Sequence, residues 1–132
     1  MPRQKAGTTD VAISDAEAVV MQVIWERGSL ATEDIISALQ RRAKWSDSTV
    51  KTLLNRLLNK GALSATKDNR RFVYSAVLTK AEWLATESDG FLDRVFGGRV
   101  APLVSYFSQH KKLAKDDIAE LKRLIRELDD ER

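Results

Sequence analysis

The 132-residue sequence contains no cysteine and only one histidine, His110. Without cysteine the chain can form neither a disulfide nor the Cys/His clusters of structural zinc sites, so we expect no metal and no cofactor. It also lacks the run of about 18 apolar residues that a membrane span needs, and residues 1–10 lack the apolar stretch of a signal peptide. These absences predict a cytoplasmic protein with no membrane partner.

Catalytic patterns are missing as well. The sequence has no glycine-rich phosphate loop and no histidine paired with a cysteine or serine nucleophile. Its acidic residues gather near the C-terminal end as Asp129, Asp130 and Glu131, which is typical of a solvated tail. We therefore expect that the protein is not an enzyme.

Positive charge is concentrated in one part of the chain. The formal net charge is only +3, but residues 41–71 hold nine Lys or Arg against two acids, a net of +7. Residues 79–132 hold ten basic and eleven acidic side chains, a net of −1. A polyanion would therefore be attracted to the first part of the chain only.

The first 61 residues carry the signals of three helices. Apolar positions recur at helical spacing in residues 14–27, 32–42 and 47–60, and each run ends near a glycine or a basic residue. The expected helix caps are Ser14, with Glu17 completing a capping box, Thr32 and Ser46, and the expected stops are Gly28 and Gly61.

The pattern then changes from helical spacing to alternation, which is typical of strands. Two short runs separated by Asp68 and Asn69 predict a β-hairpin. Its alternating apolar positions are Leu63, Ala65, Phe72, Tyr74 and Ala76. Three helices followed by a hairpin are the element order of a winged helix-turn-helix.

The C-terminal part predicts three more helices. Thr79 and Glu82 repeat the capping-box spacing and open a helix that ends at Gly97-Gly98. A short helix with Pro102 in its first turn follows, and the last helix carries an apolar seam that needs a partner. We expect a homodimer built on Phe91, Leu92, Val95, Leu103, Val104, Phe107, Ile118, Leu121, Ile125 and Leu128.

The third helix is the candidate for recognition of double-stranded DNA, because a helix-turn-helix places its last helix in the major groove. Hydroxyl, amide and guanidinium groups can reach phosphate oxygens and base edges, so we expect this helix to give specificity and the basic hairpin tip to give affinity. The expected contacts are Ser46, Ser48, Thr49, Lys51, Thr52, Asn55 and Arg56 on the helix, and Lys67, Arg70 and Arg71 on the wing.

Two alternatives stay open. The basic face could bind an acidic protein rather than DNA, and steep salt dependence with preference for a palindrome would distinguish DNA binding. Alternatively, release from DNA could depend on a small molecule in a cavity lined by Trp83 and Phe91.

The fold class is the same in each case: mainly α with a small β-hairpin. The expected parts are a flexible arm (1–12), a winged-helix DNA-binding domain (13–78) and a helical dimerisation region (79–132).

Several segments resemble the penicillinase-repressor family, which includes the β-lactamase, methicillin-resistance and copper-responsive repressors. They are SDAEAVVMQVIW from Ser14, WSDSTVKTLLNRLLNKGAL from Trp45, RRFVYSA from Arg70, GFLDRVFGG from Gly90 and LAKDDIAELKRLI from Leu113. The resemblance implies a homodimer that binds an inverted repeat in an operator and blocks transcription. It aligns Thr49, Lys51, Thr52 and Arg56 with DNA-contacting positions of the family.

The sequence departs from the family pattern at three points. Copper-responsive members release DNA through a cysteine cluster, which this chain lacks. Antibiotic-responsive members are cleaved at an Asn-Phe bond, and the matching dipeptide here is Tyr106-Phe107. Ala114 stands where relatives have a capping serine, a change that costs about 1 kcal/mol at typical caps.

Overall fold

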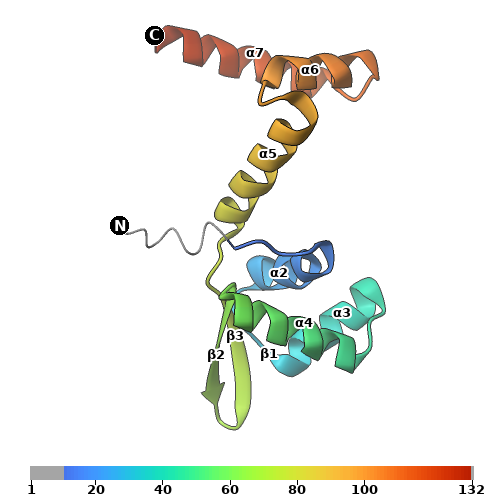
Figure 1. The fold of residues 1–132 in the computed structure, drawn as a ribbon, viewed down its shortest axis with the longest axis vertical. Coiled ribbons are helices and arrows are strands. Elements are labelled where there is room, and N and C mark those ends of the chain that lie inside the picture. Colours follow the sequence, from blue (N-terminus) through green and yellow to red (C-terminus); the bar gives the residue numbers. More distant parts are fainter. Residues whose placement is uncertain (1–10, 132) are drawn as a thin grey trace. The chain divides into compact units, whose positions relative to one another are not determined.

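The computed structural model describes residues 11–131 (Figure 1). By its contacts the chain divides into two units, Met1–Glu87 and Ser88–Arg132. The elements in chain order are α2 (Asp15–Arg27), β1 (Leu30–Ala31), α3 (Thr32–Ala43), α4 (Asp47–Lys60), β2 (Leu63–Asp68), β3 (Arg71–Ala76), α5 (Lys80–Phe96), α6 (Val100–Gln109) and α7 (Lys115–Asp130). The prediction of a mainly α fold with a winged helix-turn-helix is confirmed.

Helix α2 begins at the predicted capping box. The Ser14 hydroxyl accepts from the Glu17 backbone N–H at 3.1 Å, and the Glu17 carboxylate accepts from the Ser14 backbone N–H at 2.8 Å. The helix ends at Gly28, whose φ of 88° is a conformation that glycine adopts most easily. Both predicted ends of this helix are therefore confirmed.

The predicted cap of α3 is wrong by one residue. The N-cap is Ala31, and Thr32 is the first helical residue, with no side-chain hydrogen bond at the cap. The reason is that Leu30 and Ala31 form a short strand, β1, paired antiparallel with Tyr74 and Val73 of β3. The Thr32 hydroxyl instead donates to the Phe72 carbonyl across this pairing, at 3.5 Å.

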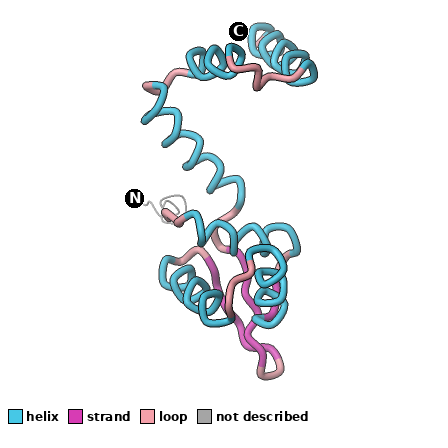
Figure 2. Tube along the Cα trace, turned by 90° about the vertical axis from the view of Figure 1, so that its right-hand side faces the viewer, coloured by secondary structure: helices cyan, strands magenta, loops and turns pink. Residues whose placement is uncertain are grey.

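The sheet has three strands in the order β1-β3-β2, and β2 and β3 form the predicted hairpin. Residues 63–68 of β2 pair with residues 71–76 of β3, so Asp68 lies opposite Arg71 inside the ladder. The turn is therefore Asn69-Arg70 and not the predicted Asp68-Asn69. Both turn residues have positive φ, 50° and 71°, as the tight turns of two-residue hairpins require. Figure 2 shows the hairpin extending away from the helices of this unit.

The first unit has a continuous apolar core between its helices and its sheet. The helices contribute the stripes that the sequence predicted, and half-buried Trp25 and Trp45 pack against them. Val11 also packs against this core, so the end of the predicted arm at residues 11–12 is part of the fold, while residues 1–10 lie outside the described residues. The core residues are Val20, Met21, Val23, Ile24, Ile35, Ala38, Leu39, Val50, Leu53, Leu54, Leu57, Ala62, Leu63, Tyr74 and Leu78.

The three C-terminal helices have no buried residue. Aromatic rings contact one another in this part: the Phe91 and Phe96 rings lie 5.9 Å apart, and the Phe96 and Tyr106 rings 6.4 Å apart. Ala114 caps α7 without a side-chain bond, as the sequence predicted. The contacts divide the chain within α5, after Glu87, and the predicted boundary after residue 78 stays a prediction.

Candidate nucleic-acid interface

Helix α4 has one buried face and one exposed face. Val50, Leu53, Leu54 and Leu57 are at most 5% exposed and fix the helix on the core of the first unit. The predicted contact residues all lie on the other side of the helix and are exposed. They are Ser48, Thr49, Lys51, Thr52, Asn55 and Arg56, with Ser46 at the cap. The structure therefore presents hydroxyl, amide and cationic groups together on one helical surface.

Hydroxyl groups gather at the first turn of α4. The Ser46 hydroxyl accepts from the Thr49 backbone N–H at 3.2 Å, which confirms the predicted cap. The same oxygen lies 3.0 Å from the Thr49 hydroxyl and 3.3 Å from the Ser48 hydroxyl. Hydroxyls at a helix N-terminus are suited to phosphate oxygens, because the helix dipole and unpaired N–H groups also favour negative charge there.

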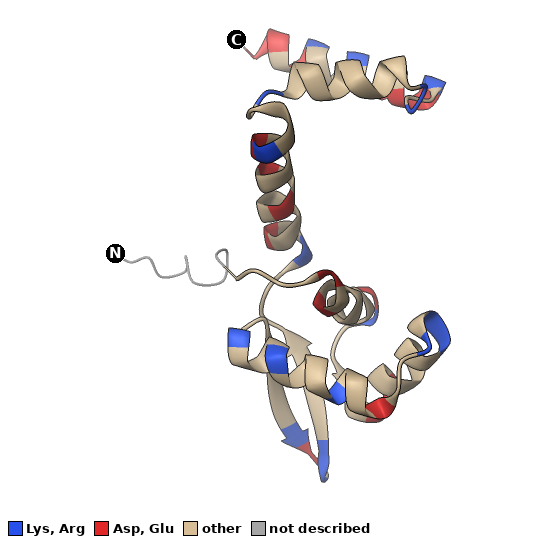
Figure 3. Cartoon of the chain, turned by 45° about the vertical axis from the view of Figure 1, so that its right-hand side comes forward, with Lys and Arg blue, Asp and Glu red and all other residues tan. Residues whose placement is uncertain are grey.

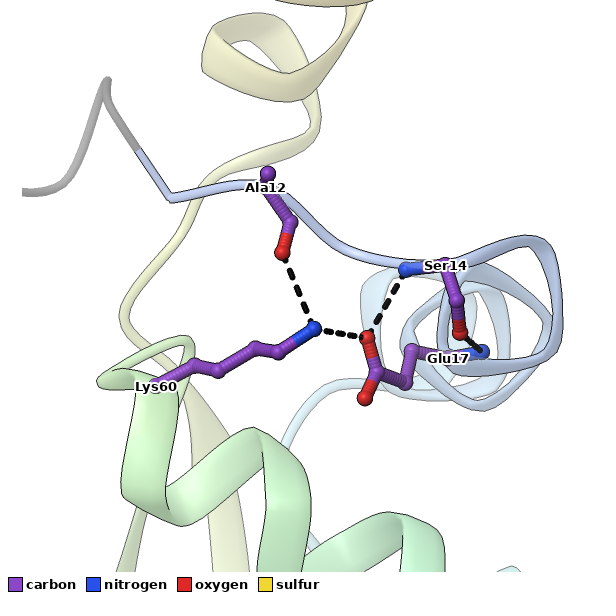
Figure 4. A network of polar contacts seen from close by, with 4 residues as sticks. All are labelled: Ala12, Ser14, Glu17 and Lys60. Atoms are coloured by element: carbon purple, nitrogen blue, oxygen red, sulfur yellow. Dashed lines mark hydrogen bonds and ion pairs between the residues drawn. The ribbon is translucent and has the colours of Figure 1, made fainter.

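The last turn of α4 is attached to α2 by an ion pair (Figure 4). The Lys60 ammonium lies 2.5 Å from the Glu17 carboxylate and donates to the Ala12 carbonyl at 3.0 Å. Burial of Glu17 acts to raise its pKa, but the hydrogen bonds from Lys60 and Ser14 and the charge of Lys60 outweigh burial and hold the pKa below its ordinary value. Lys60 thus stabilises the position of α4, and its ammonium group is paired with partners within the fold.

The wing carries its cations near the tip of the hairpin. Lys67, Arg70 and Arg71 are all exposed, as the sequence predicted. The Lys67 ammonium lies over the Phe72 ring, 5.9 Å from its centroid, and Phe72 is 51% exposed. Phe72 lies two residues before Tyr74 on β3 and so on the same face of the strand, but Tyr74 is buried in the core whereas Phe72, nearer the hairpin tip, is exposed.

Most cations of the basic segment, residues 41–71, are available to a ligand. Arg42 is paired with Glu26 at 2.7 Å, and this hydrogen bond lowers the pKa of the Glu26 carboxyl. Among residues 11–131, no ion pair is found for Arg41, Lys44, Lys51, Arg56, Lys67, Arg70 or Arg71. Figure 3 shows Lys and Arg on α4, in the turn before it and at the hairpin tip.

The predicted dimerisation residues lie in α5, α6 and α7 and remain accessible in the single chain. Phe91 is 39% exposed, Val95 54%, and Ile125 and Leu128 56% each. Ile118 is exposed too, and the other members are half-buried, namely Leu92, Leu103, Val104, Phe107 and Leu121. Their role in an interface stays a prediction.

The alternative of a ligand cavity lined by Trp83 and Phe91 in the dimer region stays a hypothesis, because the structure describes a single chain. The Trp83 ring packs on Trp25, with ring centroids 5.3 Å apart, and Phe91 packs on Phe96. Within the described residues no pocket and no group of three metal-binding side chains is present. No helix in this part of the chain combines the length and the apolar character needed to cross a membrane.

Sequence reasoning missed the role of Glu17 beyond its cap. A signal was available, because Glu17 lies at helical spacing from the apolar residues Val20, Met21 and Ile24. A carboxylate on a buried stripe requires a cation or hydrogen-bond donors. Lys60 could not be identified as that cation, since 43 residues separate the two positions.

Comparison with known proteins agrees with this architecture. The solution structure of the DNA binding domain of the repressor BlaI superposes with a TM-score of 0.51 and 42% sequence identity, covering 55% of this chain and 88% of that one. The penicillinase repressor of Bacillus licheniformis is 36% identical over 115 residues, 87% of this chain and 90% of that protein.

The similarity extends to the methicillin-resistance regulators. The methicillin resistance regulatory protein MecI of Staphylococcus aureus is 33% identical over 113 residues, 86% of this chain and 92% of that protein. The family model described as Penicillinase repressor matches residues 13–127, which include the winged helix and most of the C-terminal helices. The chain belongs to the penicillinase-repressor family.

Proposed function

We propose that this protein is a cytoplasmic transcriptional repressor that binds an inverted repeat in double-stranded DNA as a homodimer, and that an unidentified signal releases it. The observation that carries the proposal is the exposed face of α4. This face carries hydroxyl, amide and unpaired cationic side chains, and the opposite face of the helix is packed on the core. Such a helix can enter the major groove without unfolding any part of the core.

The exposed residues of α4 and the cations of the wing would have different roles in DNA binding. Arg56 and Asn55 on α4 can form paired hydrogen bonds with purine edges, so they would give sequence preference. Lys67, Arg70 and Arg71 on the wing would contact phosphates, which strengthens binding to any sequence. The excess of positive charge lies in residues 41–71, within this unit, as expected if only this part meets the polyanion.

The exposed apolar residues of the C-terminal helices support a homodimer. Helices with no buried residue and several large apolar side chains on the surface need a partner to cover them. A second copy is the simplest partner, since α7 carries an apolar seam at coiled-coil spacing. Two copies related by twofold symmetry then match two half-sites of a palindrome.

The decisive experiment selects fragments from random double-stranded DNA with the purified full-length chain at physiological salt. We expect enrichment of one palindrome, binding that weakens steeply as salt rises, and sedimentation of the free protein as a dimer at micromolar concentration. Recovery of fragments without sequence preference would refute the repressor function. It would leave the acidic-protein partner as the better explanation of the basic face.

A further inference from the structure

The segment that leads from the winged helix into α5 is held at several points. The backbone N–H groups of Val77 and Leu78 both donate to the Ala62 carbonyl, at 2.9 and 3.0 Å. Leu78 is 1% exposed and belongs to the core of the first unit. The chain therefore enters α5 from a fixed position, directly after the end of the sheet.

The first turn of α5 is fixed in the same way. The Thr79 backbone N–H donates to the Glu82 carboxylate at 2.9 Å, and the Glu82 N–H donates to the Thr79 hydroxyl at 3.0 Å. This capping box sets the residue at which the helix begins. It does not set the direction of the helix, because both of its partners belong to α5 and its cap.

Two tryptophans connect the first turn of α5 to α2. Trp25, in the last turns of α2, donates from its indole N–H to the Leu78 carbonyl at 2.9 Å. The Trp83 ring lies on Trp25, with centroids 5.3 Å apart and ring planes inclined by 37°. Both rings are half-buried against the core, so Trp83 holds α5 to the winged helix one turn after its start.

We propose that Trp83 is a positioning residue: by packing on Trp25 it fixes the direction in which α5 leaves the winged helix, and so determines which spacing between DNA half-sites the dimer accepts. The inference rests on the proposed homodimeric repressor. It assigns to the tryptophan pair a role in selecting the operator that is separate from contacts with the bases.

The physical reason lies in the geometry of two linked sites. When both winged helices of a dimer are held in fixed directions, one half-site spacing is bound without distortion and other spacings are penalised. One added base pair turns a half-site by about 34° and moves it by about 3.4 Å along the DNA axis. If the entry to α5 becomes free to bend, the dimer tolerates both spacings, but its effective concentration at the second half-site falls.

The test compares Trp83→Ala with the wild-type chain on three DNA probes. These are the palindrome selected by the wild type, the same palindrome with one base pair inserted between its halves, and a single half-site. We expect the wild type to lose affinity by about tenfold or more on the insertion, and Trp83→Ala to lose less than about threefold. Affinity for the single half-site should change by less than about twofold, because the α4 surface is untouched.

Matched variants separate positioning from folding. Trp83→Phe keeps an aromatic ring on Trp25 and should restore the wild-type spacing penalty, whereas Leu84→Ala removes an apolar side chain that is 47% exposed and should leave the penalty unchanged. Circular dichroism and sedimentation verify that each variant is folded and dimeric. If Trp83→Ala does not fold, Trp83→Leu, which keeps an apolar side chain but is too small to stack on the Trp25 ring, gives the same comparison.

The outcomes are distinguishable. A folded, dimeric Trp83→Ala or Trp83→Leu chain that keeps the wild-type spacing penalty overturns the inference, and so does an equal loss on the half-site and on both palindromes. A wild-type chain that selects no palindrome, or stays monomeric, overturns the proposed function and with it this inference.

Discussion

Replacing Lys60 by methionine removes the cation that neutralises Glu17 while keeping a similar side-chain length at the end of α4. The Glu17 side chain is 2% exposed, so its carboxylate would remain buried with the Ser14 N–H as its principal donor. Removing one partner of a fully buried ion pair costs about 3 to 5 kcal/mol. The Lys60 side chain is 39% exposed, and water already screens part of this attraction. We therefore expect the free energy of unfolding to fall by about 2 kcal/mol at pH 7.

The effect of this substitution depends on pH, and its sign follows from the pKa of Glu17. In the wild type this pKa lies below the ordinary value of 4.5, so the ionised carboxylate stabilises the fold above pH 4.5. That contribution is lost as the pH falls through the lowered pKa. In Lys60→Met, burial without the cation raises the pKa of Glu17, and protonation relieves the penalty. The difference in stability between the two chains should therefore be largest at pH 7 and smaller near pH 4.5.

Urea unfolding at fixed protein concentration, followed by circular dichroism at both pH values, measures the difference. Lys51→Met is the matched control, because Lys51 lies on the exposed face of the same helix and has no ion pair within residues 11–131. It should change stability by no more than about 0.5 kcal/mol. In a Glu17→Gln background the Lys60→Met cost should shrink by more than half, since no buried charge remains. An undiminished cost in that background, or equal costs for Lys60→Met and Lys51→Met, would refute the reasoning.

Three further predictions concern DNA binding and assembly. Arg56→Ala or Thr52→Ala should each reduce discrimination between the selected palindrome and a scrambled duplex by about 1 to 3 kcal/mol in gel-shift titrations, and unchanged discrimination would place base recognition elsewhere. Lys67→Ala should weaken binding to both duplexes equally and lower the slope of affinity against salt by about one ion, so a loss confined to the palindrome would contradict a phosphate contact. Leu121→Asp should give monomers in sedimentation while near-native circular dichroism of the winged helix persists, and surviving dimers would move the interface away from the α7 seam.

Local signals in the sequence determined most of the helices. The Ser14 and Thr79 capping boxes, the Ser46 cap and the Gly61 stop each depend on residues within four positions of one another, so the sequence alone contains the whole interaction. The same holds for the two faces of α4, because helical spacing alone decides which side chains are opposite Leu53 and Leu57. The composition of the exposed face of α4 could therefore be predicted from the sequence.

Contacts between residues far apart in the sequence were decided by the tertiary structure, because no local pattern contains them. Strand β1 has only two residues and exists because β3 pairs with it, so its presence moved the cap of α3 from Thr32 to Ala31. The Glu17–Lys60 ion pair joins positions 43 residues apart, and the Trp25 indole reaches a carbonyl 53 residues away. Such contacts depend on how elements pack around a shared core, and packing brings together residues whose separation in sequence carries no periodic signal. The sequence by itself thus determined which face of α4 is polar and exposed, and only the folded chain decided how that helix and the start of α5 are held.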